Sequence, residues 1–169
     1  MLNRPINAEQ QAWYERIPRL LLLALIAEKA RRARHSAEVL VTALMKYVFL
    51  LQMEGNASRR RFYRFIPYHY GPFAKEVYTE LEKLKEEGLI TVHEDREEEE
   101  TRIRLTNPTR VEQAIGELPE DLKEDIVSII EAYGELDHGA LLERVYEKYP
   151  AYAKKSWLRR RRAIKERSE

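Results

Sequence analysis

The stretch over residues 59–90 constrains the fold most, because it holds an amphipathic helix followed by a glycine and a strand pattern. One stripe of this helix, over residues 73–87, is apolar at the 3.6-residue period: Phe73, Val77, Leu81 and Leu84. Gly88 follows at the position where a left-handed C-cap usually falls. Residues 89–92 and 101–106 are predicted strands on either side of a polar tip. A helix followed by a two-stranded ribbon is typical of the second half of a winged helix.

Two long helices are predicted before this stretch. Asn7 and Gln10 form a capping-box pattern for a helix over residues 8–16. Pro18 is expected to interrupt that helix or to start the next one, over residues 19–34. Ser36 is predicted to cap a second long helix over residues 37–53, which has almost no polar face and therefore belongs at the centre of a domain. A short aromatic run over residues 62–66 then favours β structure, and a turn is predicted over residues 70–72.

Lys46 is the one charge in the second helix between Glu38 and Glu54. A lysine in such apolar surroundings must extend its ammonium group to solvent or meet a carboxylate. We interpret Lys46 first as a structural residue and second as a contact to a partner.

The chain after the ribbon predicts three more helices. Asn107 and Pro108 indicate the start of a short helix over residues 109–115. Another helix begins after Pro119 and ends at Gly134, and Asp137 can cap the next one. The last two helices are amphipathic and predict a hairpin that closes the core.

Charge is segregated along the chain, although the net charge of +1 over 169 residues gives no overall field that draws it to nucleic acid. The ribbon tip, residues 94–100, is strongly acidic, and the helix before the ribbon carries more glutamates than lysines. Because DNA affinity depends mainly on neutralising phosphates, these charges disfavour the usual groove-reading geometry. An acidic tip suits nucleic-acid mimicry, a basic partner, or a solvated loop that discourages edge pairing.

Two clusters are basic instead. The first interleaves four arginines with aromatic residues: Arg59, Arg60, Arg61 and Arg64. This mixture suits nucleic acid, equally suits a hot spot for a protein partner, and is also compatible with a solvated loop before an edge strand. The second cluster is the C-terminal tail, with Lys154, Lys155, Arg159, Arg160, Arg161 and Arg162. It suits a nucleic-acid arm, contact with an acidic surface, docking onto the acidic tip, or a solvated tail.

Motifs for catalysis and metal binding are missing from the sequence. The absence of cysteine excludes disulfides, thiolate metal sites and cysteine nucleophiles. The four histidines are scattered, and the chain has no His-Glu-x-x-His, no glycine-rich phosphate loop and no Gly-x-Ser-x-Gly elbow. We expect a protein that is not an enzyme and holds no cofactor and no metal. The longest apolar run, residues 20–27, is too short to span a bilayer, so we expect a cytoplasmic protein without membrane contact.

A set of short motifs extends over residues 36–157. It comprises Pro67-Tyr68-His69-Tyr70-Gly71-Pro72-Phe73, Glu76-Val77-Tyr78, Leu81, Leu84 and Gly88-Leu89-Ile90, with further matching segments at residues 45–51 and 142–156. Together these motifs resemble the Panacea or SocA-type antitoxin domain and are similar to YwgA-type proteins. The resemblance implies a chain that binds and neutralises a partner toxin. The N-terminal 35 residues and the arginine-rich tail lie outside the family pattern.

The whole sequence therefore predicts a mostly helical α+β fold. A winged-helix-like domain over residues 36–153, with a two-stranded β-wing and a C-terminal helical hairpin, follows an N-terminal helical segment over residues 1–35 and precedes a basic helix or tail over residues 154–169. The expected function is that of a non-enzymatic, antitoxin-like protein that neutralises a partner protein and regulates its own transcription. The alternative is a DNA-binding winged-helix regulator that uses the two basic clusters, and a structural or adaptor protein comes third. Six residues are expected to contact the partner: Tyr63, Tyr68, His69, Tyr70, Phe73 and Tyr78.

Overall fold

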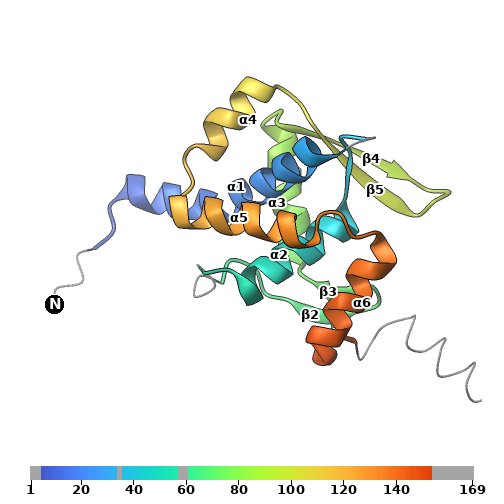
Figure 1. Cartoon of the computed structure of the whole chain (residues 1–169). Helices are drawn as coiled ribbons and strands as arrows, with labels where there is room; N and C mark the ends of the chain where they lie inside the picture. The colour runs from blue at the N-terminus through green and yellow to red at the C-terminus, as the bar shows by residue number, and fades with distance from the viewer. Residues whose placement is uncertain (1–4, 34–35, 57–60, 154–169) are drawn as a thin grey trace, which may run out of the picture.

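The computed structural model describes residues 5–33, 36–56 and 61–153, and it confirms a mostly helical α+β fold (Figure 1). The winged-helix-like part contains, in chain order, α1 (Ala8–Arg32), β1 (Val39–Leu40), α2 (Val41–Glu54), α3 (Lys75–Glu86), β4 (Ile90–Asp95) and β5 (Glu100–Leu105). A hairpin is inserted between α2 and α3 and consists of β2 (Ile66–Tyr68) and β3 (Gly71–Phe73). The wing is followed by α4 (Pro108–Ile115), α5 (Glu120–Tyr133), α6 (His138–Lys148) and the short 3-10 helix η1 (Pro150–Ala153).

Helix α1 runs unbroken through Pro18, so the expectation that this proline interrupts a helix or starts a new one is wrong. Proline lacks the N–H that bonds to the carbonyl four residues earlier, which costs roughly 3 kcal/mol in a helix interior. Burial of the next turn offsets that cost, because the four leucines at positions 20–23 are completely buried and each contributes roughly 1.5–3 kcal/mol. The N-terminal segment over residues 1–35 thus supplies α1 to the same core as the rest of the chain.

Strand β1 lies where the sequence predicts the first turn of the second long helix, which begins only at Val41. Its two residues pair with Ile103 and Arg102 of β5, which gives a three-stranded sheet in the order β1-β5-β4. Ser36 does not cap a helix, and its hydroxyl instead accepts a 3.2 Å hydrogen bond from the Glu38 N–H. The prediction failed because two apolar residues that run into an apolar helix carry no periodicity of their own.

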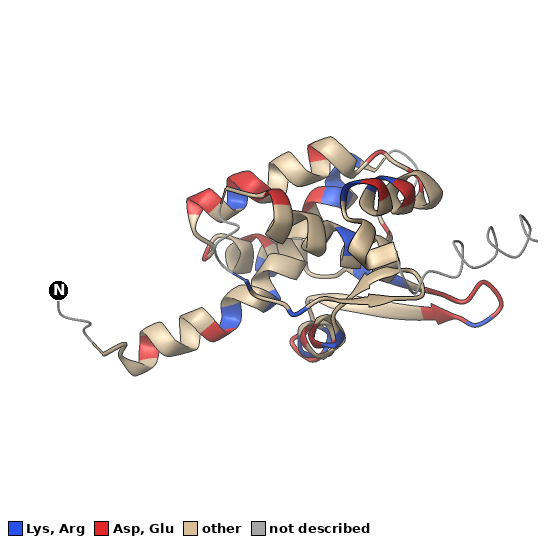
Figure 2. Ribbon diagram, turned by 90° about the horizontal axis from the view of Figure 1, so that it is seen from below, with Lys and Arg blue, Asp and Glu red and all other residues tan. Residues whose placement is uncertain are grey.

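The wing has the predicted form. Strands β4 and β5 pair in antiparallel register from Ile90 opposite Leu105 to Asp95 opposite Glu100. Gly88 has a φ of +74°, the left-handed conformation that a helix C-cap requires and that glycine adopts without strain. The wing extends from the body of the molecule, and acidic residues gather at its tip (Figure 2).

The first strand of the β2–β3 hairpin begins only at Ile66, the last residue of the predicted run, and the turn falls at His69 and Tyr70, one residue earlier than predicted. The Gln52 side chain explains this shift. Its amide oxygen accepts from the Tyr63 N–H at 2.8 Å, and its amide nitrogen donates to the Tyr63 carbonyl at 3.0 Å. These bonds satisfy the backbone polar groups of Tyr63 without a strand partner.

Helices α5 and α6 follow each other after α4, as predicted, and α6 turns away from α5 (Figure 1). Helix α5 packs against α1 and α2, while α6 packs against α2 and β3. Asp137 caps α6 as expected, accepting a 2.8 Å hydrogen bond from the Ala140 N–H. Within the described ranges, no helix is both long and apolar enough to cross a membrane.

Candidate functional site

A cavity of about 260 Å³ lies between the first turns of α2, the β2–β3 hairpin, α3 and the wing. Lys46 from α2 lines it, and we call it the Lys46 cavity. The sequence had named four more of its lining residues as partner contacts: Tyr68, Tyr70, Phe73 and Tyr78. The fold therefore brings most of the expected partner-binding residues to one place.

Three tyrosines of this cavity are exposed to solvent, and we call them the tyrosine face. The exposed fraction is 42% for Tyr68, 54% for Tyr70 and 47% for Tyr78. Phe73 joins them, since its ring centroid lies 4.9 Å from that of Tyr68 and 5.9 Å from that of Tyr78. His69, in the hairpin turn, has its ring centroid 4.6 Å from that of Tyr68, with the two rings tilted by 54°. Clustered exposed aromatic rings are typical of interaction surfaces, because they bury large areas at a small cost in side-chain entropy.

Lys46 contrasts with these exposed rings because only 1% of it is accessible. Its ammonium group has three donors, and one of them bonds to the Thr42 carbonyl oxygen at 3.0 Å. Among the described residues, no carboxylate pairs with it. Burial therefore lowers the pKa of Lys46 from its usual 10.5 to about 8. From the sequence we expected the ammonium group either to extend to solvent or to meet a carboxylate. Among the described residues it does neither.

Gly71 explains why the hairpin can lie so close to this lysine. Its φ is +104°, and a Cβ atom built there would lie 3.2 Å from Cδ1 of Leu142 and 3.9 Å from Cε of Lys46. A side chain at this position would be strained and would press on α6. The glycine of the Tyr70-Gly71-Pro72 motif thus allows the hairpin to cover the lysine stem while Tyr70 remains at the surface.

A second hollow of about 230 Å³ adjoins the first and shares Thr42, Tyr70 and Glu99 with it. We call it the wing cavity, because Glu98, Glu99 and Glu100 of the wing line it together with His138 at the start of α6. The pKa of His138 is lowered, chiefly by burial and then by the charge of Lys46. Because Glu99 lines both cavities, one carboxylate lies in the cavity of the buried cation and two more lie in the wing cavity.

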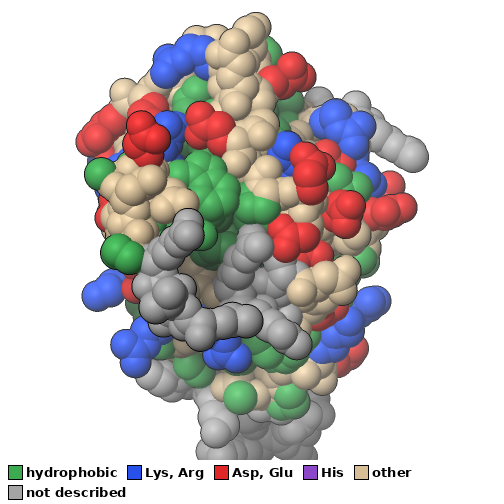
Figure 3. Space-filling view, turned by 90° about the vertical axis from the view of Figure 1, so that its left-hand side faces the viewer, with side chains coloured by type: hydrophobic (Ala, Val, Ile, Leu, Met, Phe, Trp, Pro, Cys, Tyr) green, Lys and Arg blue, Asp and Glu red, His purple; other side chains and the backbone are tan. Residues whose placement is uncertain are grey.

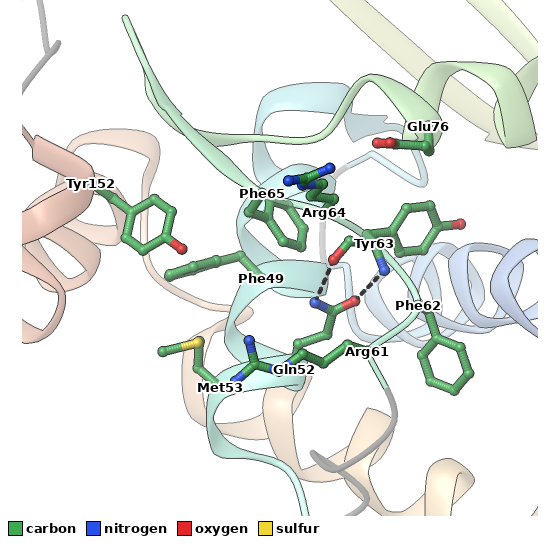
Figure 4. A pocket seen from close by; sticks show the side chains of 10 residues that line it. All are labelled: Phe49, Gln52, Met53, Arg61, Phe62, Tyr63, Arg64, Phe65, Glu76 and Tyr152. Atoms are coloured by element: carbon green, nitrogen blue, oxygen red, sulfur yellow. Dashed lines mark hydrogen bonds between the residues drawn. The ribbon is translucent and has the colours of Figure 1, made fainter.

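The arginine cluster lines a different cavity, of about 360 Å³, at the other end of α2 (Figure 4). Arg61 and Arg64 lie there beside Phe62 and Phe65. Tyr63 points away from solvent, is 5% exposed and donates a 2.7 Å hydrogen bond to the Pro18 carbonyl. It therefore lies apart from the tyrosine face. The remaining basic candidates lie outside the described residues: Arg59, Arg60, Lys154, Lys155, Arg159, Arg160, Arg161 and Arg162.

Charges on the described surface are mixed. Two of the glutamates of helix α3 and its C-cap, Glu80 and Glu87, pair with Arg19 of α1 at 2.9 and 3.1 Å, so α3 is less acidic than its sequence indicates. One face of the molecule shows acidic and basic side chains interspersed around a hydrophobic patch (Figure 3). The wing tip remains acidic (Figure 2).

The sequence missed two features of these sites. It gave no reason to place His138 near Lys46, because the two residues lie on different helices. It also missed a polar cluster at the end of α2, where Glu54 accepts hydrogen bonds from Tyr133, Tyr149 and Lys148. The one available signal was Lys46 itself, a single charge within an apolar helix.

No family model matches this chain, and neither the curated proteins nor the solved structures yield a match. Among the described residues, no group of three or more histidine, aspartate or glutamate side chains is placed to hold a metal ion.

Proposed function

We propose that this chain is a non-enzymatic, antitoxin-like protein that binds and neutralises a partner protein through its tyrosine face. The observation that carries this proposal is the gathering of Tyr68, Tyr70 and Tyr78 around one cavity while each remains about half exposed. Tyrosine is among the residues that dominate binding energy at protein interfaces. The family resemblance of the same motifs supports a toxin as the partner.

The charge of the wing supports a protein partner over DNA. In a winged helix the wing and the helix before it face the duplex, and here the wing tip carries Asp95 and the four glutamates at positions 97–100. Such a surface repels phosphates and weakens DNA binding. The same carboxylates attract a partner with a basic surface, and they increase its association rate.

Growth rescue tests this proposal. Each product of the neighbouring genes is co-expressed with this chain, and one of them is expected to be toxic alone and harmless in its presence. Replacement of Tyr68, Tyr70 and Tyr78 together by alanine is expected to abolish rescue. The matched control is Tyr14→Ala, which removes a tyrosine of the same exposure, 52%, from the far end of α1. Equal rescue by the triple variant and the wild type would contradict the proposal.

DNA binding is the second candidate, supported by the placement of Arg61 and Arg64 beside two aromatic rings at one cavity. Combined with the tail, these arginines would let the chain regulate its own transcription. Replacing Arg159, Arg160, Arg161 and Arg162 by alanine is then expected to weaken binding to the chain's own promoter and to flatten its salt dependence. An unchanged salt slope would contradict this role.

A further inference from the structure

The strongest unexplained feature among the described residues is a buried lysine that makes no ion pair with a carboxylate, although Glu99 lines the same cavity. A cation removed from water is stable only when it is paired and hydrogen-bonded. Within the described ranges Lys46 has one hydrogen bond, to a backbone carbonyl, and only 1% of the residue is exposed. The described part of the chain leaves room for the missing anion, because Lys46 lines an open cavity of about 260 Å³.

The walls of this cavity define what can reach the ammonium group. Aromatic rings surround the opening, and the Phe73 ring packs between those of Tyr68 and Tyr78. An aliphatic stem packs well against such rings, and a carboxylate at its end can take the charge-assisted hydrogen bonds that lysine offers. Glutamate and aspartate side chains have this composition.

The adjoining wing cavity sets a second requirement. Glu98 and Glu99 lie beside the path to Lys46 and repel an isolated anion, whereas Glu100 already pairs with Arg102 at 3.1 Å. A carboxylate with a cationic neighbour suits both cavities, because the carboxylate can pair with Lys46 while its neighbour pairs with the wing glutamates. Since the pKa of His138 is lowered, that histidine adds no positive charge near neutral pH to compete for the carboxylates.

We propose that the Lys46 cavity receives an acidic side chain from the partner protein, next to a basic side chain that pairs with the wing glutamates. This inference rests on the proposed function, since it names the contact made within the tyrosine face. A folded partner that covers exposed tyrosines presents side chains, so we assign the carboxylate to a side chain and not to a chain end.

The first test uses two blocked tripeptides, N-acetyl-Lys-Glu-Lys-amide and N-acetyl-Lys-Gln-Lys-amide. The full chain, labelled with ¹³C at the lysine ε-carbon, is titrated with each, and the Lys46 resonance is assigned from its loss in Lys46→Met. The glutamate peptide is expected to shift this resonance saturably, and the glutamine peptide is not. Equal responses, or none, would overturn the inference. Preference for a glutamine peptide with a free C-terminal carboxylate would show that the cavity binds a chain end and not a side chain, and this result would equally overturn the inference.

The second test uses the rescue experiment and keeps the two proposals distinguishable. Lys46→Met replaces a buried cation by an apolar side chain of similar length, so it is expected to fold and yet bind the partner at least about thirtyfold more weakly. Lys148→Met is the matched control, because that lysine already has an internal carboxylate. Full rescue by Lys46→Met with loss in the tyrosine variant would refute this inference alone. Full rescue by both would refute the proposed function.

Discussion

Lys46 and Lys148 both lie beside tyrosines, and of the two only Lys148 pairs with a carboxylate of the described residues. Lys148, on α6, lies 3.2 Å from the Glu54 carboxylate and donates a 2.7 Å hydrogen bond to the Tyr133 hydroxyl, and its pKa is raised, first by that bond. Lys46, on α2, bonds to a backbone carbonyl and to no other group in the described part of the chain, and burial lowers its pKa to about 8.

The environment of Lys148 shows how this fold satisfies a lysine that contributes to stability. At the Lys148 cluster, Glu54 also accepts hydrogen bonds from Tyr133 and Tyr149, so these polar groups satisfy one another. The cluster ties the end of α2 to α5 and to the end of α6. At the Lys46 cavity the tyrosines are exposed to solvent, and no carboxylate of the described residues pairs with the lysine. We infer that the first arrangement is complete within the chain and that the second requires a partner.

The largest expected effect is the pH dependence that Lys46 gives to stability. Its folded pKa of about 8 lies below the unfolded value of 10.5, so between these values the unfolded chain holds a proton that the folded chain has lost. Stability therefore rises with pH in this window. The free energy of unfolding of the wild type, relative to Lys46→Met, is expected to rise by about 2–3 kcal/mol from pH 8 to pH 10.

Urea denaturation of both proteins at several pH values measures this difference, in which the other titrating groups cancel. The series stops at pH 10, because burial raises the pKa of Tyr47 to about 12 and its ionisation on unfolding reduces stability above that point. Parallel curves for the two proteins would show that Lys46 is not an uncompensated buried cation.

A smaller loss is expected when the satisfied cluster is broken. Glu54→Gln removes the charge that accepts bonds from Lys148, Tyr133 and Tyr149, and it should lower the free energy of unfolding by about 1–2 kcal/mol. Glu147→Gln, on the exposed face of α6, is the control and should change it by less than about 0.5 kcal/mol. If the two variants were equally stable, the Glu54 cluster would contribute nothing to the fold.

The smallest effect on stability is expected when Lys46 is given a carboxylate partner. This change tests most directly whether the missing carboxylate is what distinguishes Lys46 from Lys148. Thr42 lies one helical turn before Lys46, so Thr42→Glu places a carboxylate at the favourable i, i+4 spacing and should stabilise the chain by up to about 1 kcal/mol. The pKa of Lys46 should rise by at least about one unit. Rescue by this variant should fail, because the internal carboxylate occupies the cavity. Thr42→Gln should leave the pKa of Lys46 low, and a similar rise in both variants would exclude a charge effect.

Local signals in the sequence predicted much of the fold. The Asn7 and Asp137 caps, the left-handed Gly88 and the wing strands each depend on residues close together in the chain, and the structure has them all. The errors came from tertiary contacts. Burial of the leucines after Pro18 keeps α1 continuous, and pairing with β5 turns the start of the second helix into a strand.

The sequence predicted only part of the candidate site, because the rest depends on tertiary contacts. The motif around Tyr70 and Gly71 showed where aromatic residues gather, and Lys46 was conspicuous as a lone charge. Their meeting in one cavity depends on how the hairpin packs on α2, and the arrival of His138 and Glu99 depends on the closure of α6 and the wing. Whether a buried lysine pairs with a carboxylate depends on tertiary contacts, which the sequence pattern does not contain.

The most direct test of this account is the pKa of Lys46 in the free protein. It can be followed by ¹³C NMR of the lysine ε-carbon across pH 6 to 11, with Lys46→Met to assign the signal. The account predicts a midpoint at about 8, far below that of Lys148. A midpoint at or above the ordinary lysine value of 10.5 would mean that the cation is already paired within the chain, and it would remove the reason for an acidic partner.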